Sequence, residues 1–209
     1  MRSADWYFDF ISPFAYFASL RLEELSSKLQ LQTHPILFAG LLNHWGQKGP
    51  AEIAGKRAWT YRWCVWHAQQ HNIPFKAPAS HPFNPVPYLR LALATGCAPA
   101  ALHTIFEAIW TTGADATDPL LVADLAARLQ VDPARLAQQD LKDALRSETD
   151  RAIARGVFGV PTLAIGEELF WGADAIDFAL AYAADPALLE NAEMRRVKTL
   201  RVGVARKQL

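Results

Sequence analysis

The pattern of apolar and polar positions divides the chain into an α/β frame interrupted by a helical block. An apolar, aromatic run at residues 5–10 predicts a strand, and a 3.6-residue period over residues 13–29 predicts a helix. A second strand is expected at residues 31–38. Such a strand–helix–strand unit has parallel strands joined by a right-handed crossover, so both strands end at the same edge of the sheet.

The rest of the pattern places helices in the middle and strands near the end. Residues 39–50 mix glycines with polar groups and are expected to form a loop, and residues 50–156 are typical of helices punctuated by proline and glycine. Strand character returns at residues 157–165 and 168–171, which predicts a hairpin about a glycine-containing turn. Helices are expected to follow from residue 175 onward.

The first helix of the middle block carries three tryptophans on one face. Trp59, Trp63 and Trp66 recur at helical spacing, and we expect this stripe to be part of the core. His67 and His71 on the same helix have the spacing of metal ligands. No glutamate follows His67 and no third ligand is evident, so we expect no metal site.

Composition narrows the class of protein. A length of 209 residues with 51% hydrophobic side chains predicts one domain, or one domain with a large insertion. The 21 basic and 21 acidic residues cancel, which gives no reason to expect a nucleic-acid partner. Cys64 and Cys97 form neither a disulfide framework nor a dithiol motif. Without a signal-peptide plan or a membrane-length apolar run, a cytoplasmic protein is expected.

The candidate chemistry begins where the first strand meets the first helix. Ser12 can be the N-cap of that helix and Pro13 its first residue. Unpaired backbone N–H groups and the helix dipole favour negative charge at such a point. A serine before a proline is usually only a cap, so the spacing alone does not assign Ser12 a catalytic role.

Four segments, in order along the chain, resemble motifs of one enzyme family. Residues 10–16, 39–50, 158–162 and 170–174 are similar to motifs of kappa-class glutathione transferases and of their relatives, the 2-hydroxychromene-2-carboxylate isomerases. The family has a DsbA-type thioredoxin-like fold with a large all-helical insertion. The resemblance therefore implies an α/β thioredoxin-like domain at residues 1–48 and 157–209, and a helical insertion at residues 49–156.

The resemblance implies a glutathione site. Ser12 would donate a hydrogen bond to the sulfur of glutathione and so favour its thiolate. Val160 and Pro161 would form a cis-proline turn whose backbone pairs with glutathione as a strand does. Ala173 and Asp174, at a helix start, would bind the γ-glutamyl end, with free N–H groups on its carboxylate and Asp174 on its ammonium group.

Residues 39–50 depart from the family pattern at two positions. Gln47 stands where relatives carry asparagine, which keeps the amide for glutathione binding but moves it outward by one methylene. Asn43 stands where relatives often carry lysine. If that lysine steadies a substrate carboxylate, Asn43 must do so by hydrogen bonding, or Lys48 or Arg57 must substitute. These departures bear on the substrate more than on the glutathione site.

Three further residues are candidates for substrate binding. Phe83 and Asn84 lie in a segment that resembles the isomerase branch, where Asn84 would hold a substrate carbonyl or hydroxyl. Phe83 and Trp45 would pack on an aromatic ring. The alternatives are structural, because Asn84 is also a competent cap before Pro85 and both aromatic residues can be core.

The resemblance therefore implies a glutathione-dependent isomerase. It would interconvert 2-hydroxychromene-2-carboxylate and trans-o-hydroxybenzylidenepyruvate, or a similar aromatic compound, by reversible addition of a thiolate. One alternative is a kappa-like transferase that conjugates glutathione to an electrophile; another is a non-catalytic thioredoxin-like binding module. Relatives are commonly homodimers, and a homodimer is expected here.

Overall fold

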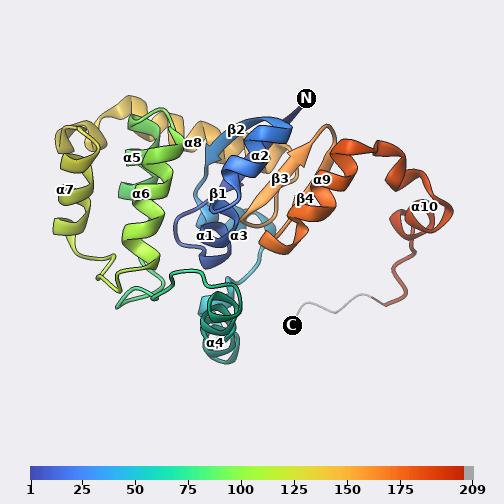
Figure 1. Cartoon of the computed structure of the whole chain (residues 1–209), viewed down its shortest axis with the longest axis horizontal. Coiled ribbons are helices and arrows are strands. Elements are labelled where there is room, and N and C mark those ends of the chain that lie inside the picture. The colour runs from blue at the N-terminus through green and yellow to red at the C-terminus, as the bar shows by residue number, and fades with distance from the viewer. Residues whose placement is uncertain (205–209) are drawn as a thin grey trace.

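A four-stranded mixed sheet lies at the centre of the computed structural model, which describes residues 1–204 (Figure 1). The strand order is β2-β1-β3-β4, with β1 parallel to β2, and with β3 antiparallel to both β1 and β4. The strands are β1 (Arg2–Phe8), β2 (Leu29–Pro35), β3 (Thr162–Ile165) and β4 (Glu168–Trp171). The parallel pair and the hairpin confirm the predicted frame. The last five residues of the range 157–209 lie outside the described residues.

Helices cover the sheet and lie to both sides of it (Figure 1). The α-helices are α1 (Pro13–Ser19), α2 (Leu22–Lys28), α3 (Phe38–Trp45), α4 (Ala54–Gln70), α5 (Val86–Ala94), α6 (Pro99–Trp110), α7 (Pro119–Arg128), α8 (Gln139–Ala154), α9 (Ile176–Ala184) and α10 (Ala192–Lys198). Short 3-10 helices are η1 (Pro50–Glu52), η2 (Pro133–Ala137), η3 (Ala173–Ala175) and η4 (Pro186–Glu190). None of the helices in residues 1–204 has the length and hydropathy needed to cross a bilayer.

The first predicted helix is broken in two, so the expectation of one helix over residues 13–29 is wrong. Arg21 leaves helical geometry, with φ −104° and ψ 8°, between α1 and α2. Its guanidinium reaches Asp177 of α9 at 2.6 Å and Glu24 of α2 at 2.7 Å. The break therefore places a cation where it can join α2 to α9.

The predicted loop at residues 39–50 is also wrong, because its first half is the helix α3. Gly40 lies inside this helix, where a Cβ atom would come within 2.9 Å of the Thr149 side chain on α8. Glycine here permits close packing of two helices and does not mark a loop. Gly46, in the left-handed conformation with φ 62°, ends the helix.

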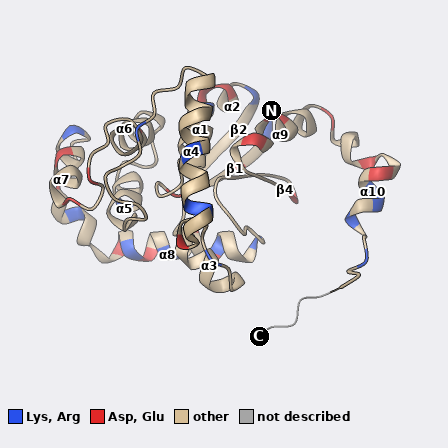
Figure 2. Ribbon diagram, turned by 90° about the horizontal axis from the view of Figure 1, so that it is seen from below, with Lys and Arg blue, Asp and Glu red and all other residues tan. Residues whose placement is uncertain are grey.

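The tryptophan stripe of α4 belongs to the core only in part, which corrects a third expectation: Trp63 is half-buried and packs against the core, but its two neighbours in the stripe do not. Trp59 is 63% exposed and Trp66 is 54% exposed. The residues of α4 that are buried are Cys64 and Ala68, a narrow stripe of small side chains. In Figures 1 and 2, α4 lies on the outside of the body.

One hydrophobic core joins the sheet to the helical block. Phe106 of α6 contacts the aromatic rings of Trp6 and Phe8 on β1. The indole N–H of Trp110 donates to the carbonyl oxygen of Phe10 at 3.0 Å. The division of the chain into residues 1–48 with 157–209 and residues 49–156 stays a prediction. Buried side chains of both parts belong to the same hydrophobic cluster.

Candidate functional site

Ser12 caps α1, as the sequence predicts, with Pro13 as the first helical residue. Its hydroxyl oxygen accepts a hydrogen bond from the Ala15 N–H at 3.2 Å and lies 3.4 Å from the Val160 carbonyl oxygen. A separation of 3.4 Å is long for a hydroxyl donor, whose usual distance is about 2.7–2.8 Å. The hydroxyl hydrogen can therefore rotate toward a better acceptor.

The turn opposite Ser12 contains a cis peptide bond between Val160 and Pro161, as expected. The Pro161 carbonyl accepts a hydrogen bond from the Gly172 N–H at 2.9 Å. The side-chain hydroxyl of Thr162 donates to the Gly159 carbonyl at 2.7 Å and closes the turn. The start of β3 is thus held between α1 and the end of β4.

Ala173 and Asp174 lie in η3, directly after β4, and η3 contacts α1. Gly172 has φ 105°, and a Cβ atom there would lie 2.3 Å from Oδ1 of Asp174. Only glycine fits this backbone, and the Asp174 carboxylate folds over it. Asp174 is exposed. The structure therefore brings Ser12, the cis-proline turn and η3 together at one corner, which we call the Ser12 corner.

The three candidates on α3 and after it lie at the surface. Asn43 and Gln47 are exposed. Trp45 is 43% exposed, and its indole N–H donates to the Val157 carbonyl at 2.9 Å. This bond places the end of α3 beside the segment that leads into Val160. Binding roles for Asn43, Trp45 and Gln47 stay predictions.

Phe83 and Asn84 are used structurally. Phe83 is buried and packs edge-on against His81 and Tyr88. The Asn84 side-chain oxygen accepts a hydrogen bond from the Val86 N–H at 3.1 Å, so it holds the start of α5 although Pro85 is the N-cap residue. Their roles in substrate binding stay predictions.

Asp9 holds the backbone next to the Ser12 corner, a role that the sequence did not predict. Its carboxylate accepts hydrogen bonds from the Ile11 N–H at 3.0 Å and the Phe38 N–H at 2.9 Å. It thereby ties the turn before Ser12 to the first turn of α3. The carboxyl group is fully buried, and burial raises its pKa to about 7, although these two hydrogen bonds oppose the shift. The signal that could have pointed to it is a carboxylate set between two phenylalanines, directly after an apolar strand.

His81 is a second residue that the sequence left unassigned. Nε2 of His81 lies 2.7 Å from the Ile11 carbonyl oxygen, and Nδ1 lies 2.5 Å from the Tyr61 hydroxyl on α4. The imidazole thus links α4 to the residue that precedes Ser12. A lone histidine in the loop between α4 and α5 carries no pattern that would reveal this contact.

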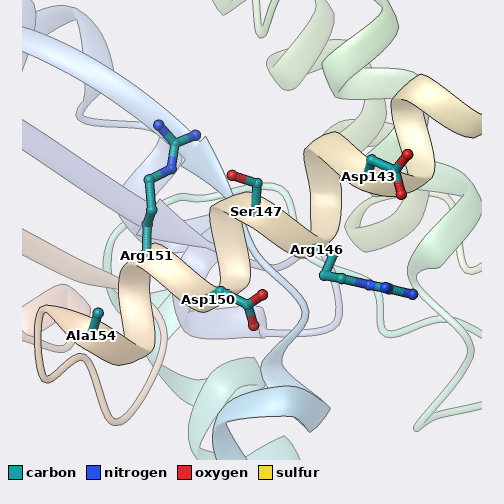
Figure 3. A pocket seen from close by; sticks show the side chains of 6 residues that line it. All are labelled: Asp143, Arg146, Ser147, Asp150, Arg151 and Ala154. Carbon is teal, nitrogen blue, oxygen red and sulfur yellow. The ribbon is translucent and has the colours of Figure 1, made fainter.

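Two hollows of the surface are lined by residues outside the Ser12 corner. A shallow one of about 370 Å³ is lined only by α8, through Asp143, Arg146, Ser147, Asp150, Arg151 and Ala154 (Figure 3). Its side chains diverge along a single helix and converge on no common point (Figure 3). Within residues 1–204, no three His, Cys, Asp or Glu side chains are grouped closely enough to hold a metal ion.

Comparison with known proteins agrees with this geometry. The family model of the DSBA-like thioredoxin domain matches residues 4–183. The chain is 30% identical over 203 residues to the 2-hydroxychromene-2-carboxylate isomerase of Pseudomonas putida, with 91% of this chain and 98% of that protein covered. It is 25% identical over 205 residues to glutathione S-transferase kappa 2 of Caenorhabditis elegans, with 87% and 91% covered.

Solved structures give the same result. A 2-hydroxychromene-2-carboxylate isomerase superposes with a TM-score of 0.74 and 27% identity, covering 91% of this chain and 98% of that one. The cytosolic disulfide reductase DsbM of Pseudomonas aeruginosa, solved with GSH, superposes with a TM-score of 0.59 and 18% identity over 94% and 99% of the two chains, a likeness of fold alone. The chain therefore belongs to the DSBA-like thioredoxin family and, within it, to the 2-hydroxychromene-2-carboxylate isomerase and kappa-class glutathione transferase group.

Proposed function

We propose that the protein is a glutathione-dependent isomerase that interconverts 2-hydroxychromene-2-carboxylate and trans-o-hydroxybenzylidenepyruvate, or a similar aromatic compound. Relatives that match over most of both chains are named isomerases of this type. Glutathione is suggested by the name of the kappa-class relative and by the DsbM structure solved with GSH.

The observation that carries the proposal is the Ser12 corner itself. A cysteine at the Ser12 position would make a thiol–disulfide enzyme of this fold, and serine removes that chemistry. Serine leaves a hydroxyl donor beside the first N–H groups of α1, directly opposite the cis-proline turn. Such a corner can bind the sulfur atom of a thiol-containing ligand.

The residues of the corner fit glutathione. Asp174 is exposed and can pair with an ammonium group, while the N–H groups at the start of η3 can donate to a carboxylate. The backbone at Val160 can pair with an extended peptide, as strand edges do. When bound, glutathione supplies a thiolate that can add reversibly to a conjugated carbon. The role of Ser12 is to stabilise that negative charge by donating its hydroxyl hydrogen.

The aromatic substrate would lie between the Ser12 corner and α3. Trp45 presents an exposed ring next to the segment that leads to Val160, and it would contact a flat substrate. Asn43 and Gln47 lie within one turn of this ring and offer amide groups to substrate and glutathione.

The test is an isomerisation assay with and without glutathione, followed by mass measurement of the product. The proposal predicts turnover that requires glutathione and a product with the mass of the substrate. A stable adduct, heavier by one glutathione, would instead identify a transferase, the activity of the Caenorhabditis relative. Failure of glutathione to raise the melting temperature would favour a non-catalytic binding module.

A further inference from the structure

We propose that Arg57, Tyr61 and His81 form a subsite for the hydroxyl and carboxylate groups of a 2-hydroxy acid, and that Tyr61 and His81 relay the hydroxyl proton. This inference rests on the proposed function, because it assigns the polar end of the substrate at the same site. It starts from three side chains that the glutathione site leaves unused.

The hydrogen bonds of His81 fix its tautomer. The Ile11 carbonyl can only accept, so Nε2 of His81 carries the hydrogen and donates to it at 2.7 Å. Nδ1 is then an acceptor, and the Tyr61 hydroxyl, 2.5 Å away, donates to it. Burial lowers the pKa of His81, which agrees with a neutral imidazole.

This arrangement leaves the phenolic oxygen of Tyr61 as an acceptor. Its hydrogen is directed to His81, so its lone pairs can receive a hydrogen bond from a ligand hydroxyl. Tyr61 is only partly buried, and it lies at the side of the Ser12 corner because His81 connects it to Ile11. The other rings around His81 are those of Phe83 and Trp110, which offer no competing charge.

Arg57 supplies the cation. It precedes Tyr61 by one turn of α4. Burial raises the pKa of Tyr61 and lowers that of His81, and the charge of Arg57 opposes the first shift and adds to the second. Arg57 is exposed, and the ion pairs formed among residues 1–204 do not include it. Helix α4 carries Lys56, Arg57 and Arg62 but no acidic residue, as the blue bands in Figure 2 show. A carboxylate from a ligand would be the natural partner of Arg57.

The relay serves the opening of a cyclic 2-hydroxy acid. The substrate hydroxyl gives its proton to the Tyr61 oxygen while the Tyr61 proton moves to Nδ1 of His81. The hydroxyl oxygen becomes a carbonyl as the bond from its carbon to the ring oxygen breaks, and the ring oxygen leaves as a phenolate. The imidazolium of His81, held by the Ile11 carbonyl, then returns one proton through Tyr61 to that phenolate. Protons and charge balance, and no further reactant is required.

The test uses three small probes that do not react. Mandelate has an aromatic ring with a hydroxyl and a carboxylate on one carbon; phenylacetate lacks the hydroxyl, and 1-phenylethanol lacks the carboxylate. Calorimetric or NMR titration of the wild-type protein should show mandelate binding about tenfold more tightly than either partial probe. Equal binding of the three probes, or no binding of any, overturns the subsite.

Variants separate the two contacts. Tyr61→Phe should remove the preference for mandelate over phenylacetate, whereas Tyr88→Phe should retain it, because the Tyr88 hydroxyl donates to Ala116 inside the core. Arg57→Met should remove the preference for mandelate over 1-phenylethanol, and Arg62→Met should not. A Tyr61→Phe protein that still selects the hydroxyl would contradict the assignment.

Turnover tests the relay itself. In the isomerase assay, Tyr61→Phe should lower kcat by about 100-fold, while the rise in melting temperature caused by glutathione stays as in the wild type. An unchanged kcat would overturn the relay. If the wild type binds mandelate as expected but isomerises nothing, the proposed function fails and the subsite stands.

Discussion

His34 and His81 each bridge two groups from distant parts of the chain, but the groups differ in charge. His34 lies between the carboxylates of Glu148, at 2.9 Å, and Asp5, at 3.1 Å. Those carboxylates also pair with Arg151 and Arg155. Burial lowers the pKa of His34, but the two carboxylates raise it more, so the pKa lies above its ordinary value.

His81, in contrast, lies between a phenol and a carbonyl, and its pKa is lowered by burial. Around His34 every charge has a partner of opposite sign within the protein. Around His81 the Tyr61 oxygen can still accept and Arg57 has an exposed charge. A cluster whose charges and hydrogen-bonding groups are all paired within the protein stabilises the fold. A cluster with unused donors and acceptors is suited to a ligand.

The largest effect that we predict is on stability. It concerns Asp9, a buried carboxyl group that is hydrogen-bonded to two backbone N–H groups. Its pKa is about 7 in the folded protein and 3.8 ordinarily, so the folded state favours the protonated form. The stability that the neutral group provides is present below about pH 4 and is lost as the pH rises through 7. Relative to Asp9→Asn, the wild type should lose up to about 4 kcal/mol of unfolding free energy over that range.

Denaturant unfolding at several pH values measures this loss. Asp132→Asn, a change of an exposed capping aspartate, should keep the pH dependence of the wild type. Parallel pH curves for wild type and Asp9→Asn would show that Asp9 does not titrate in the folded state as described.

The next effect is on catalysis, at Ser12. Ser12→Ala removes the hydroxyl donor and should lower kcat by about 100-fold, or about 2.7 kcal/mol, with a smaller change in KM. Steady-state kinetics measures it. Ser27→Ala removes an exposed hydroxyl that donates to Glu24, and it should have wild-type kinetics. Normal turnover in Ser12→Ala would exclude Ser12 from the reaction.

The two histidines should then give opposite pH dependences of stability. His34 has a raised pKa, so its contribution is full below about pH 6.5 and is lost as the pH rises through the folded pKa. His81 has a lowered pKa, so its contribution is full above about pH 6.5 and is lost as the pH falls. His34→Gln should therefore cost most in acid and His81→Gln most at neutral pH, each by about 1–2 kcal/mol.

Thermal unfolding across pH 5–8 measures both variants. His103→Gln, at an exposed position of α6, is the control and should follow the wild type at every pH. Slopes of the same sign for His34→Gln and His81→Gln would contradict the difference between their environments.

The smallest effect is expected at Asp174. Its carboxylate is exposed, and exposed ion pairs contribute little, so Asp174→Asn should weaken glutathione binding about fivefold. Asp177→Asn is the matched control, because Asp177 lies in the next turn and pairs with Arg21. Calorimetry should show unchanged affinity for that control; equal losses in both variants would indicate a general charge effect.

Local signals made much of the fold predictable. The Ser12–Pro13 cap and the strand–helix–strand unit depend on residues adjacent in the chain, and the structure has them. Helix α3 could not be predicted, because Gly40 is required by close packing against Thr149, which lies more than a hundred positions away in the chain. A glycine chosen for helix packing looks the same in the sequence as a glycine in a loop.

The site was predictable only in part, for the same reason. Motif resemblance marked Ser12, Val160 and Asp174, and the fold brings their segments together. The exposure of Trp59 depends on how narrow a face α4 presents to the body, which periodicity does not reveal. The role of His81 depends on its hydrogen bonds to Tyr61 and Ile11, and no local sequence pattern connects these two residues to it.

In the proposed mechanism, Ser12 keeps the sulfur of bound glutathione anionic. The most direct test of this role is a pH titration of the thiolate absorbance of glutathione bound to the wild type and to Ser12→Ala. We expect a thiol pKa in the wild-type complex well below that of free glutathione, and a return toward the free value in the variant. A bound thiol that titrates like free glutathione in the wild type would contradict it.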